Sequence, residues 1–317
     1  RQVKDLRSIA KSVRLLVSVG DIYPLFLGGR YVKAPMLFLS TAKSEYIKGH
    51  LGIECRLMRK YADLVLARDE KTSKALSEMG VATRYAGNVM MDGFAITGEN
   101  FGLTLEKKVV GILPGSREEA YRNMTTLLEI VGHLAELSCD KLDFVVGLAP
   151  NLDDDRLEHV VHGAGWRYQR QGSRERERGV TARIYPGSED ATPCVIVSRG
   201  WFGDVLNVSN IVIGLSGTGN EQAAGLGRPV VTFPTDGPQF SLKFAQAQKR
   251  LLGEAVAFVE SRDVRDIASE VMSILGDSMR IARMRKAGHA RMGEQGAATR
   301  TAKIIIEYLE TGSWEGR

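Results

Sequence analysis

The sequence is poor in cysteine and has no long apolar segment, and each shortage excludes a class of protein. Its 317 residues include three cysteines, Cys55, Cys139 and Cys194, without any C-x-x-C spacing. We therefore expect neither a disulfide framework nor a zinc site, and we place all three thiols in or near the core. The chain contains no apolar run that could span a membrane and no short apolar stretch of a signal peptide at its start. The expected location is the cytoplasm.

Motifs of nucleic-acid-binding proteins are also missing. The net charge of +5 favours an acidic partner, and nucleic acid, an anionic lipid surface and a nucleotide all fit that description. Because the sequence has no zinc finger, RNP-like aromatic strand or basic zipper, we expect no nucleic-acid partner. The alternating charges of 174–178 lie in the segment 170–188, which we interpret as a solvated surface loop.

What the chain does contain is a globular composition, 44% apolar and 26% charged, in which apolar runs alternate with amphipathic segments. This alternation predicts an α/β fold with two Rossmann-like domains, one over residues 1–104 and one over 105–317. The chain opens at Arg1 inside a helical pattern, so we expect the first domain to be incomplete. We also expect a basic amphipathic helix over 3–14, long helices over 262–276 and 279–310, and C-terminal helices that cross back to the first domain.

Two glycine-containing loops carry the strongest functional signal. Each ends an apolar strand and opens a helix, the setting in which backbone N–H groups and the helix dipole attract an anion. The first loop, 111–119, offers Gly115 and Ser116 for close backbone approach. Arg117 adds a planar cation that suits a phosphate, unless it pairs with a neighbouring glutamate on the surface.

The second loop, 215–221, repeats this pattern with a carboxylate in place of the cation. Gly217 lets a diphosphate approach the helix N-terminus, and Ser216 and Thr218 add hydroxyl groups. Glu221 lies one helical turn further on, where a carboxylate can accept hydrogen bonds from ribose hydroxyls. The alternative is a capped helix that uses glycine for tight packing. Together the two loops predict the walls of one phosphate pocket, suited to a sugar nucleotide.

These motifs resemble those of a known family. The segments 111–124, 216–234 and 87–92 are similar to lipid-A-disaccharide synthases, and the resemblance covers about 17–234, pointing to the synthase-related branch. It implies the GT-B fold, in which two Rossmann-like domains face a central cleft. It also implies inverting transfer of a glucosamine-type sugar from a UDP donor to a lipid or glycolipid acceptor, as in lipid A biosynthesis.

The resemblance also implies roles for individual residues. Asp21, at the end of an N-domain strand, takes the place of the essential aspartate and is the candidate general base. Arg117 would stabilise the departing diphosphate, and Ser216, Gly217, Thr218 and Glu221 match the donor site. A strand-terminal aspartate that caps the next turn is the alternative for Asp21.

Two further residues are candidates for contact with the donor. Asn88 opens an element that ends at Asp92 and could reach the sugar or phosphate, although a turn in which Asp92 caps a helix is equally consistent with the pattern. Gln239, like Lys243, follows the last strand of the second domain, where related transferases place polar groups on the donor sugar. The start of a helix after Pro238 is the alternative explanation.

No cofactor or metal is expected, because GT-B enzymes generally use arginine and helix dipoles, and the acidic residues 153–155 fit the first turn of a helix. The expected partners are a UDP-sugar, a lipid or glycolipid acceptor and, through basic faces at both ends of the chain, an anionic membrane surface on the cytoplasmic side. Two alternatives stay open: a UDP-N-acetylglucosamine 2-epimerase-like enzyme and a non-catalytic nucleotide-sugar-binding protein. The sequence leaves the oligomeric state undetermined.

Overall fold

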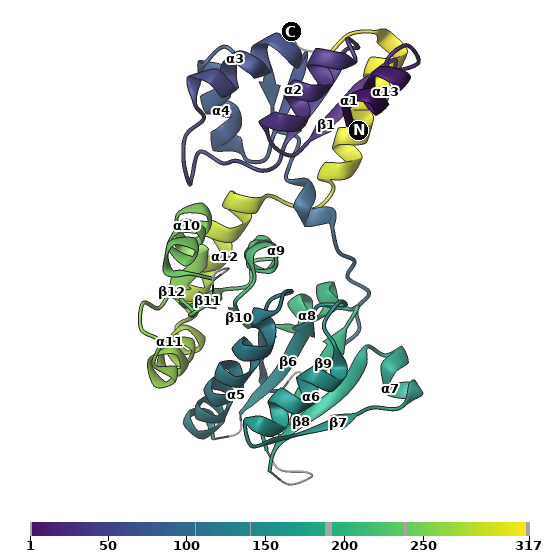
Figure 1. The fold of residues 1–317 in the computed structure, drawn as a ribbon. Coiled ribbons are helices and arrows are strands. Elements are labelled where there is room, and N and C mark those ends of the chain that lie inside the picture. Colours follow the sequence, from purple (N-terminus) through teal and green to yellow (C-terminus); the bar gives the residue numbers. More distant parts are fainter. Residues whose placement is uncertain (1, 105, 140, 188–191, 238–239, 315–317) are drawn as a thin grey trace. The chain divides into compact units, whose positions relative to one another are not determined.

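The computed structural model describes residues 2–104, 106–139, 141–187, 192–237 and 240–314 (Figure 1). The chain divides into two compact units, one formed by Arg1–Gly93 with Met292–Arg317 and the other by Phe94–Arg291. Each unit contains a largely parallel sheet with helices packed against it, which confirms the predicted α/β class. The expected boundary after residue 104 falls inside the second unit.

The first unit holds a four-stranded parallel sheet of order β1-β2-β3-β4. Its elements are α1 (Gln2–Ile9), β1 (Leu16–Val19), α2 (Ile22–Tyr31), β2 (Met36–Ser40), α3 (Gly52–Tyr61), β3 (Leu64–Ala67), α4 (Glu70–Glu78), β4 (Thr83–Arg84), the 3-10 helix η1 (Val89–Asp92) and α13 (Ala297–Thr311).

Alternation along β2 divides the core of this unit into two layers. Met36 and Phe38 point to one face, where they pack with side chains of α2, α3 and α4. Leu37 and Leu39 point to the opposite face and pack with side chains of α13. Figure 1 shows this last helix, in yellow, beside the purple and blue elements from the start of the chain. The two ends of the sequence therefore share one core.

The element that contains Asn88 and Asp92 holds the start of α13, where the chain returns to the first unit. The Asp92 carboxylate accepts hydrogen bonds from the N–H groups of Gly296, at 2.5 Å, and Ala298, at 2.6 Å, and thereby caps α13. A Cβ on Gly87 would lie 2.9 Å from the Ala297 Cβ, so this glycine lets η1 approach the helix closely. The capping that we considered for Asp92 is present, and the capped helix is more than 200 residues away in sequence.

Two predicted helices have different ends in the structure. The helix expected over 3–14 ends at Ile9, because Ser12 donates both its N–H and its hydroxyl to the Ile9 carbonyl. The helix expected over 279–310 is divided into α12 (Ser278–Met292) and α13. Between them Gly293 and Gly296 have φ values of +71° and +97°, which an α-helix cannot contain.

The second unit holds an eight-stranded sheet of order β12-β11-β10-β5-β6-β9-β8-β7. Besides α12, its elements are β5 (Lys108–Leu113), α5 (Glu119–Ser138), β6 (Leu142–Leu148), α6 (Asp154–Gly163), β7 (Trp166–Arg170), α7 (Ser173–Glu177), β8 (Val180–Pro186), β9 (Val195–Arg199), α8 (Phe202–Val208), β10 (Ile211–Gly214), α9 (Gly217–Gly225), β11 (Val230–Thr232), α10 (Leu242–Leu252), the 3-10 helix η2 (Gly253–Ala255), β12 (Val256–Phe258) and α11 (Val264–Gly276).

The segment 170–188, expected to be a surface loop, contributes secondary structure to this sheet. β8 pairs antiparallel with both β7 and β9, and the short helix α7 connects β7 to β8. Val180, Ala182 and Ile184 are buried at alternate positions of β8 and pack into the core. The run of charged residues that suggested a loop lies in α7, and in β8 the half-buried Thr181, Arg183 and Tyr185 occupy the positions between the buried ones.

The order of the strands creates a switch point at the centre of the sheet. From β5 the chain passes to β6 and then to the edge strand β7, comes back through β8 to β9 beside β6, and crosses to place β10 on the other side of β5. Connections on the two sides of β5 therefore leave in opposite directions, and the carboxyl ends of β5 and β10 face a common crevice. Across the described residues, every helix is too short or too polar to cross a membrane.

We expect the substitution Asp92→Ala to loosen α13 specifically. Loss of this cap should cost about 1–2 kcal/mol and accelerate amide hydrogen exchange in the first turns of the helix. The control is Asp263→Ala, which removes a local cap from α11, where Asp263 accepts the N–H of Arg265 at 2.8 Å. Equal exchange in α13 of the Asp92 variant and the control would contradict the capping role.

Candidate functional site

The crevice between β5 and β10 contains a cavity of about 380 Å³. Both glycine-containing loops line it, the first between β5 and α5 and the second between β10 and α9. The structure thus brings together six of the predicted residues, Gly115, Ser116, Arg117, Ser216, Gly217 and Thr218. The two predicted loops also contribute Pro114, Glu119 and Leu215 to the lining. Sequence reasoning missed Ala120, Asn123, Phe240 and Phe244, which line the same cavity.

The first loop is held through its carbonyl groups. The buried side chain of Asn123, on α5, donates to the Pro114 carbonyl at 2.9 Å, and Asn151 donates to the Ser116 carbonyl at 2.8 Å. Between them, Gly115 has a φ of +105°, and a Cβ at this position would lie 3.1 Å from the Leu215 carbonyl oxygen. The loop therefore requires glycine, and the carbonyl oxygens that would repel an anion are occupied by protein donors.

The second loop ends in a capped helix N-terminus. Ser216 is the N-cap of α9, and its hydroxyl accepts the N–H of Gly219 at 3.3 Å. The N–H groups of Gly217 and Thr218 open the helix, where helix geometry provides no partner for them. Because Gly217 lines the cavity and the helix dipole is positive at this end, the loop favours an anion.

An aromatic pair from the segment after β11 forms another wall. Phe240 is buried, whereas the Phe244 ring is 41% exposed, and the two rings meet edge to face with centroids 5.2 Å apart. A Cβ on Gly217 would lie 3.2 Å from the Phe244 ring, so this glycine keeps the ring close to the loop. An exposed aromatic ring in a polar cavity offers an apolar surface to a ligand.

Two of the three charged residues at the end of the first loop line the cavity, and the third pairs with a neighbouring helix. Arg117 is exposed and lines the cavity, as does the Glu119 carboxylate, which is 8% exposed. Glu118 pairs with Arg156 of α6, with 3.1 Å between one guanidinium nitrogen and a carboxylate oxygen, and this hydrogen bonding lowers the pKa of Glu118. Glu118, one of the neighbouring glutamates considered as a partner of Arg117, thus pairs with Arg156 of α6.

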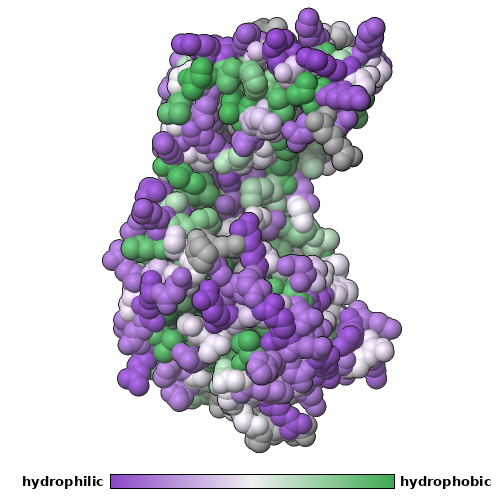
Figure 2. Space-filling view, viewed as in Figure 1, coloured by the Kyte–Doolittle hydropathy of each residue, from purple (hydrophilic) through white to green (hydrophobic). Residues whose placement is uncertain are grey.

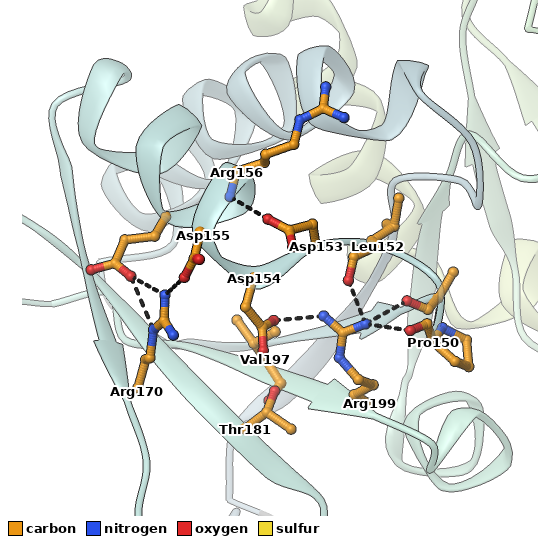
Figure 3. A network of polar contacts seen from close by, with 12 residues as sticks. Pro150, Leu152, Asp153, Asp154, Asp155, Arg156, Arg170, Thr181, Val197 and Arg199 are labelled. Carbon is orange, nitrogen blue, oxygen red and sulfur yellow. Dashed lines mark hydrogen bonds and ion pairs between the residues drawn. The ribbon is translucent and has the colours of Figure 1, made fainter.

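The three acidic residues at the start of α6 all have protein partners (Figure 3). Asp153 caps the helix by accepting the N–H three residues further on, at 2.9 Å, and Asp155 pairs with Arg170. Asp154 pairs with Arg199 at 2.6 Å, and the same guanidinium also donates to three backbone carbonyls of the loop that precedes α6. These three carboxylates thus take part in helix capping and ion pairs. The expectation that the reaction needs no metal stays a prediction.

Four predicted residues either are not among the described residues that line this cavity or lie outside the described residues. Within the part of the chain that is described, Glu221 is half-buried on α9 and does not line the cavity. Asn88 is buried in the first unit, where its amide oxygen accepts the N–H of Met90 at 3.1 Å. Asp21 is exposed after β1 and caps α2 by accepting the N–H of Tyr23 at 2.9 Å. Gln239 lies outside the described residues.

The sequence matches curated proteins, although no family model matches it. It is 27% identical over 258 residues to a lipid-A-disaccharide synthase from Trichlorobacter lovleyi, with 74% of this chain and 59% of that protein covered. A lipid-A-disaccharide synthase from Myxococcus xanthus is 25% identical, with 74% and 60% covered. This chain is thus similar in sequence to two lipid-A-disaccharide synthases. It spans about three fifths of the length of these curated relatives.

Solved structures identify the fold of this chain as GT-B. A complex of S. aureus MnaA with UDP has a TM-score of 0.62 at 15% identity, with 99% of this chain and 81% of that chain covered. The spinosyn rhamnosyltransferase SpnG with thymidine diphosphate has a TM-score of 0.58 at 16% identity, covering 98% and 77%. A UDP-GlcNAc 2-epimerase from Neisseria meningitidis bound to UDP-GlcNAc reaches 0.57 at 15%, covering 97% and 79%.

We expect Gly115→Ala to weaken both the fold and anion binding. The positive φ and the nearby Leu215 carbonyl should together cost the second unit about 1–2 kcal/mol. Displacement of the loop should also weaken binding of inorganic pyrophosphate, measured by calorimetry.

The control is Gly163→Ala at the end of α6, where an added Cβ meets nothing within 4 Å. It should leave both quantities nearly unchanged. Undiminished pyrophosphate binding by the Gly115 variant would contradict the role of this loop.

Proposed function

We propose that this protein is an inverting glycosyltransferase that moves a glucosamine-type sugar from a UDP donor to a lipid or glycolipid acceptor. The observation that carries the proposal is the cavity at the switch point, in which a glycine loop with an arginine faces a glycine loop at a helix N-terminus. Sequence similarity to two lipid-A-disaccharide synthases supports the choice of reaction.

In this proposal the donor diphosphate occupies the cavity between the two loops. The acceptor hydroxyl attacks the anomeric carbon while the bond from that carbon to the diphosphate oxygen breaks, and UDP departs with the bonding electrons. Arg117 and the N–H groups at the start of α9 stabilise the negative charge that develops on the departing oxygen. No metal is assigned, and the role of ribose ligand is proposed for Glu221, which is half-buried on α9 outside the lining of the cavity.

In this proposal Asp21 is the general base that accepts the proton of the acceptor hydroxyl. Only one oxygen of its exposed carboxylate takes part in the cap of α2, which leaves the other for a proton. Val19 and Tyr23, on either side of this residue in sequence, line an apolar groove of about 580 Å³ between α1, β1 and α2. Figure 2 shows hydrophobic residues among hydrophilic ones on the surface of this unit. An apolar groove beside a base supports an acceptor with acyl chains.

An anionic membrane surface is the proposed location of the acceptor. Support comes from the basic residues near the apolar groove, Lys4, Arg7, Lys11 and Arg14. Two of them have contacts inside the protein: Arg7 lies over the Tyr31 ring, and Arg14 donates to the Leu309 carbonyl at 3.2 Å. Lys4 and Lys11 are exposed and would face the lipid headgroups.

A UDP-N-acetylglucosamine 2-epimerase is the second candidate, because a structure with that name and a bound UDP-GlcNAc shares the fold. The two candidates differ in their need for an acceptor. The purified protein is incubated with UDP-N-acetylglucosamine and with acylated UDP-glucosamine, each with and without a glycolipid acceptor. Release of UDP and a new disaccharide only when the acceptor is present support the transferase. An epimerised sugar, or UDP released without any acceptor, supports the epimerase.

A third outcome of the same experiment identifies a non-catalytic nucleotide-sugar-binding protein. In that case UDP raises the unfolding temperature of the protein, and neither transfer nor epimerisation is detected under any condition. The absence of both stabilisation and turnover would contradict all three functions.

We expect Arg117→Ala to lower turnover much more than it weakens UDP binding. Charge develops on the departing diphosphate in the transition state, so loss of this cation should lower kcat by about a hundredfold and raise the Kd for UDP only a few-fold. The control is Arg122→Ala, an exposed arginine of α5 that lies outside the lining of this cavity. Equal losses in kcat and in UDP affinity would contradict the proposed role of Arg117.

A further inference from the structure

The loop at the start of α9 is held from inside the protein by two buried amide side chains. Gln248, on α10, is 3% exposed, and Asn220, on α9, is fully buried. The Gln248 amide nitrogen donates to the Gly217 carbonyl at 2.9 Å and to the Ser216 carbonyl at 3.4 Å. Its amide oxygen accepts from the Asn220 amide nitrogen at 2.8 Å, so the orientation of the Gln248 amide is itself determined.

The same network also occupies the carbonyl at the end of β10. The Gly214 carbonyl accepts from the Asn220 amide at 2.9 Å and from the Thr232 hydroxyl at 2.6 Å. A Cβ on Gly214 would lie 1.8 Å from the Asn220 amide oxygen, so the network also depends on this glycine. Three carbonyls of the turn from β10 to α9 are thus directed toward buried donors.

The direction of these carbonyls determines the direction of the loop's N–H groups. In a trans peptide the C=O of one residue and the N–H of the next point in opposite directions. The Ser216 carbonyl shares its peptide with the Gly217 N–H, and the Gly217 carbonyl shares its peptide with the Thr218 N–H. The Ser216 carbonyl also accepts the N–H of Asn220, at 3.3 Å, as the first hydrogen bond of α9. Gln248 holds both carbonyls in this inward direction, so the two N–H groups that open α9 point outward.

This polar network is more than core packing requires. The neighbours of Gln248 on the inner face of α10 are Ala245, Leu251 and Leu252, all buried and apolar. Apolar side chains at both positions 220 and 248 would bury as much surface without the desolvation of two amides. What the amide contributes in exchange is a single orientation of the loop.

We propose that Gln248, oriented by Asn220, is the positioning residue of the diphosphate site. It sets the direction of the Gly217 and Thr218 N–H groups before the ligand arrives. This inference rests on the proposed function, because it identifies the diphosphate as the part of the donor that the loop recognises. Gln248 affects recognition of the diphosphate alone, so contacts to the uridine are independent of it.

The test is Gln248→Met, which keeps the length of the side chain and removes its donors. Calorimetry measures binding of UDP, uridine and inorganic pyrophosphate to the wild type and to the variant. We expect the affinities for UDP and pyrophosphate to fall about tenfold or more, because two oriented donors are lost, and the affinity for uridine to stay unchanged. Asn220→Ala, which frees the Gln248 amide to rotate, should reproduce this selective loss and serves as the second variant if methionine prevents folding.

The matched control is Ser209→Ala, in which a buried hydroxyl loses its hydrogen bond to the Val205 carbonyl, 2.6 Å long, away from the cavity. It should lower stability by a similar amount and leave all three affinities unchanged. Equal losses for UDP and uridine in the Gln248 variant, or no loss for UDP, would overturn the positioning role.

The wild-type measurements distinguish a failure of the proposed function from a failure of the role of Gln248. A wild type that binds pyrophosphate and not UDP overturns the proposed function, and the role of Gln248 is then decided with pyrophosphate alone. A wild type that binds neither overturns both, because the loop would then have no diphosphate to recognise.

Discussion

The proposed chemistry depends on a constraint of parallel sheets, namely that the connections from neighbouring strands at a switch point leave in opposite directions. In the second unit this point lies between β5 and β10, and the connection from each strand leads to a helix that begins at the same edge of the sheet. Two loops separated by about a hundred residues of sequence therefore line one cavity. Neither loop alone could enclose a diphosphate.

Both loops of the cavity solve the same problem in the same way. A glycine allows the backbone to turn in the first loop and makes room for the Phe244 ring in the second. In each loop an amide side chain from a helix then holds backbone carbonyls: Asn123 in the first and Gln248 in the second. Uncharged amides hold the backbone without adding a charge of their own beside the anion. The charge that complements the ligand is left to Arg117 and to the helix dipoles.

The first unit has a different organisation, because its sheet is covered by helices from both ends of the sequence. α13 packs on the face formed by Leu37 and Leu39, and Asp92 caps its first turn. The element around Asn88, which the sequence associates with the donor, has an architectural task in the structure. Each of its polar side chains is hydrogen bonded to backbone within the unit.

Strands and loops of the second unit follow closely from the sequence, because apolar runs such as that of β5 have few alternatives to a buried parallel strand. The strand β8 was missed because it follows the charged run of α7 and carries Arg183 between its buried residues. The helix that was considered after Pro238 is present as α10. The sequence does not distinguish Gln248 from a surface glutamine, because its neighbours along the chain do not reveal its burial. Only the packing of α10 against α9 distinguishes them.

By itself the sequence determined the α/β class, the two glycine loops and the residues that meet in the cavity, because glycine, helix N-termini and apolar periodicity act over a few residues. The tertiary structure decided which long-range partners hold those residues: Gln248 on the Gly217 carbonyl, Asn123 on the Pro114 carbonyl and Asp92 on the start of α13. Hydrogen bonds between distant segments leave no periodic trace in the chain, and their geometry exists only after the elements have packed.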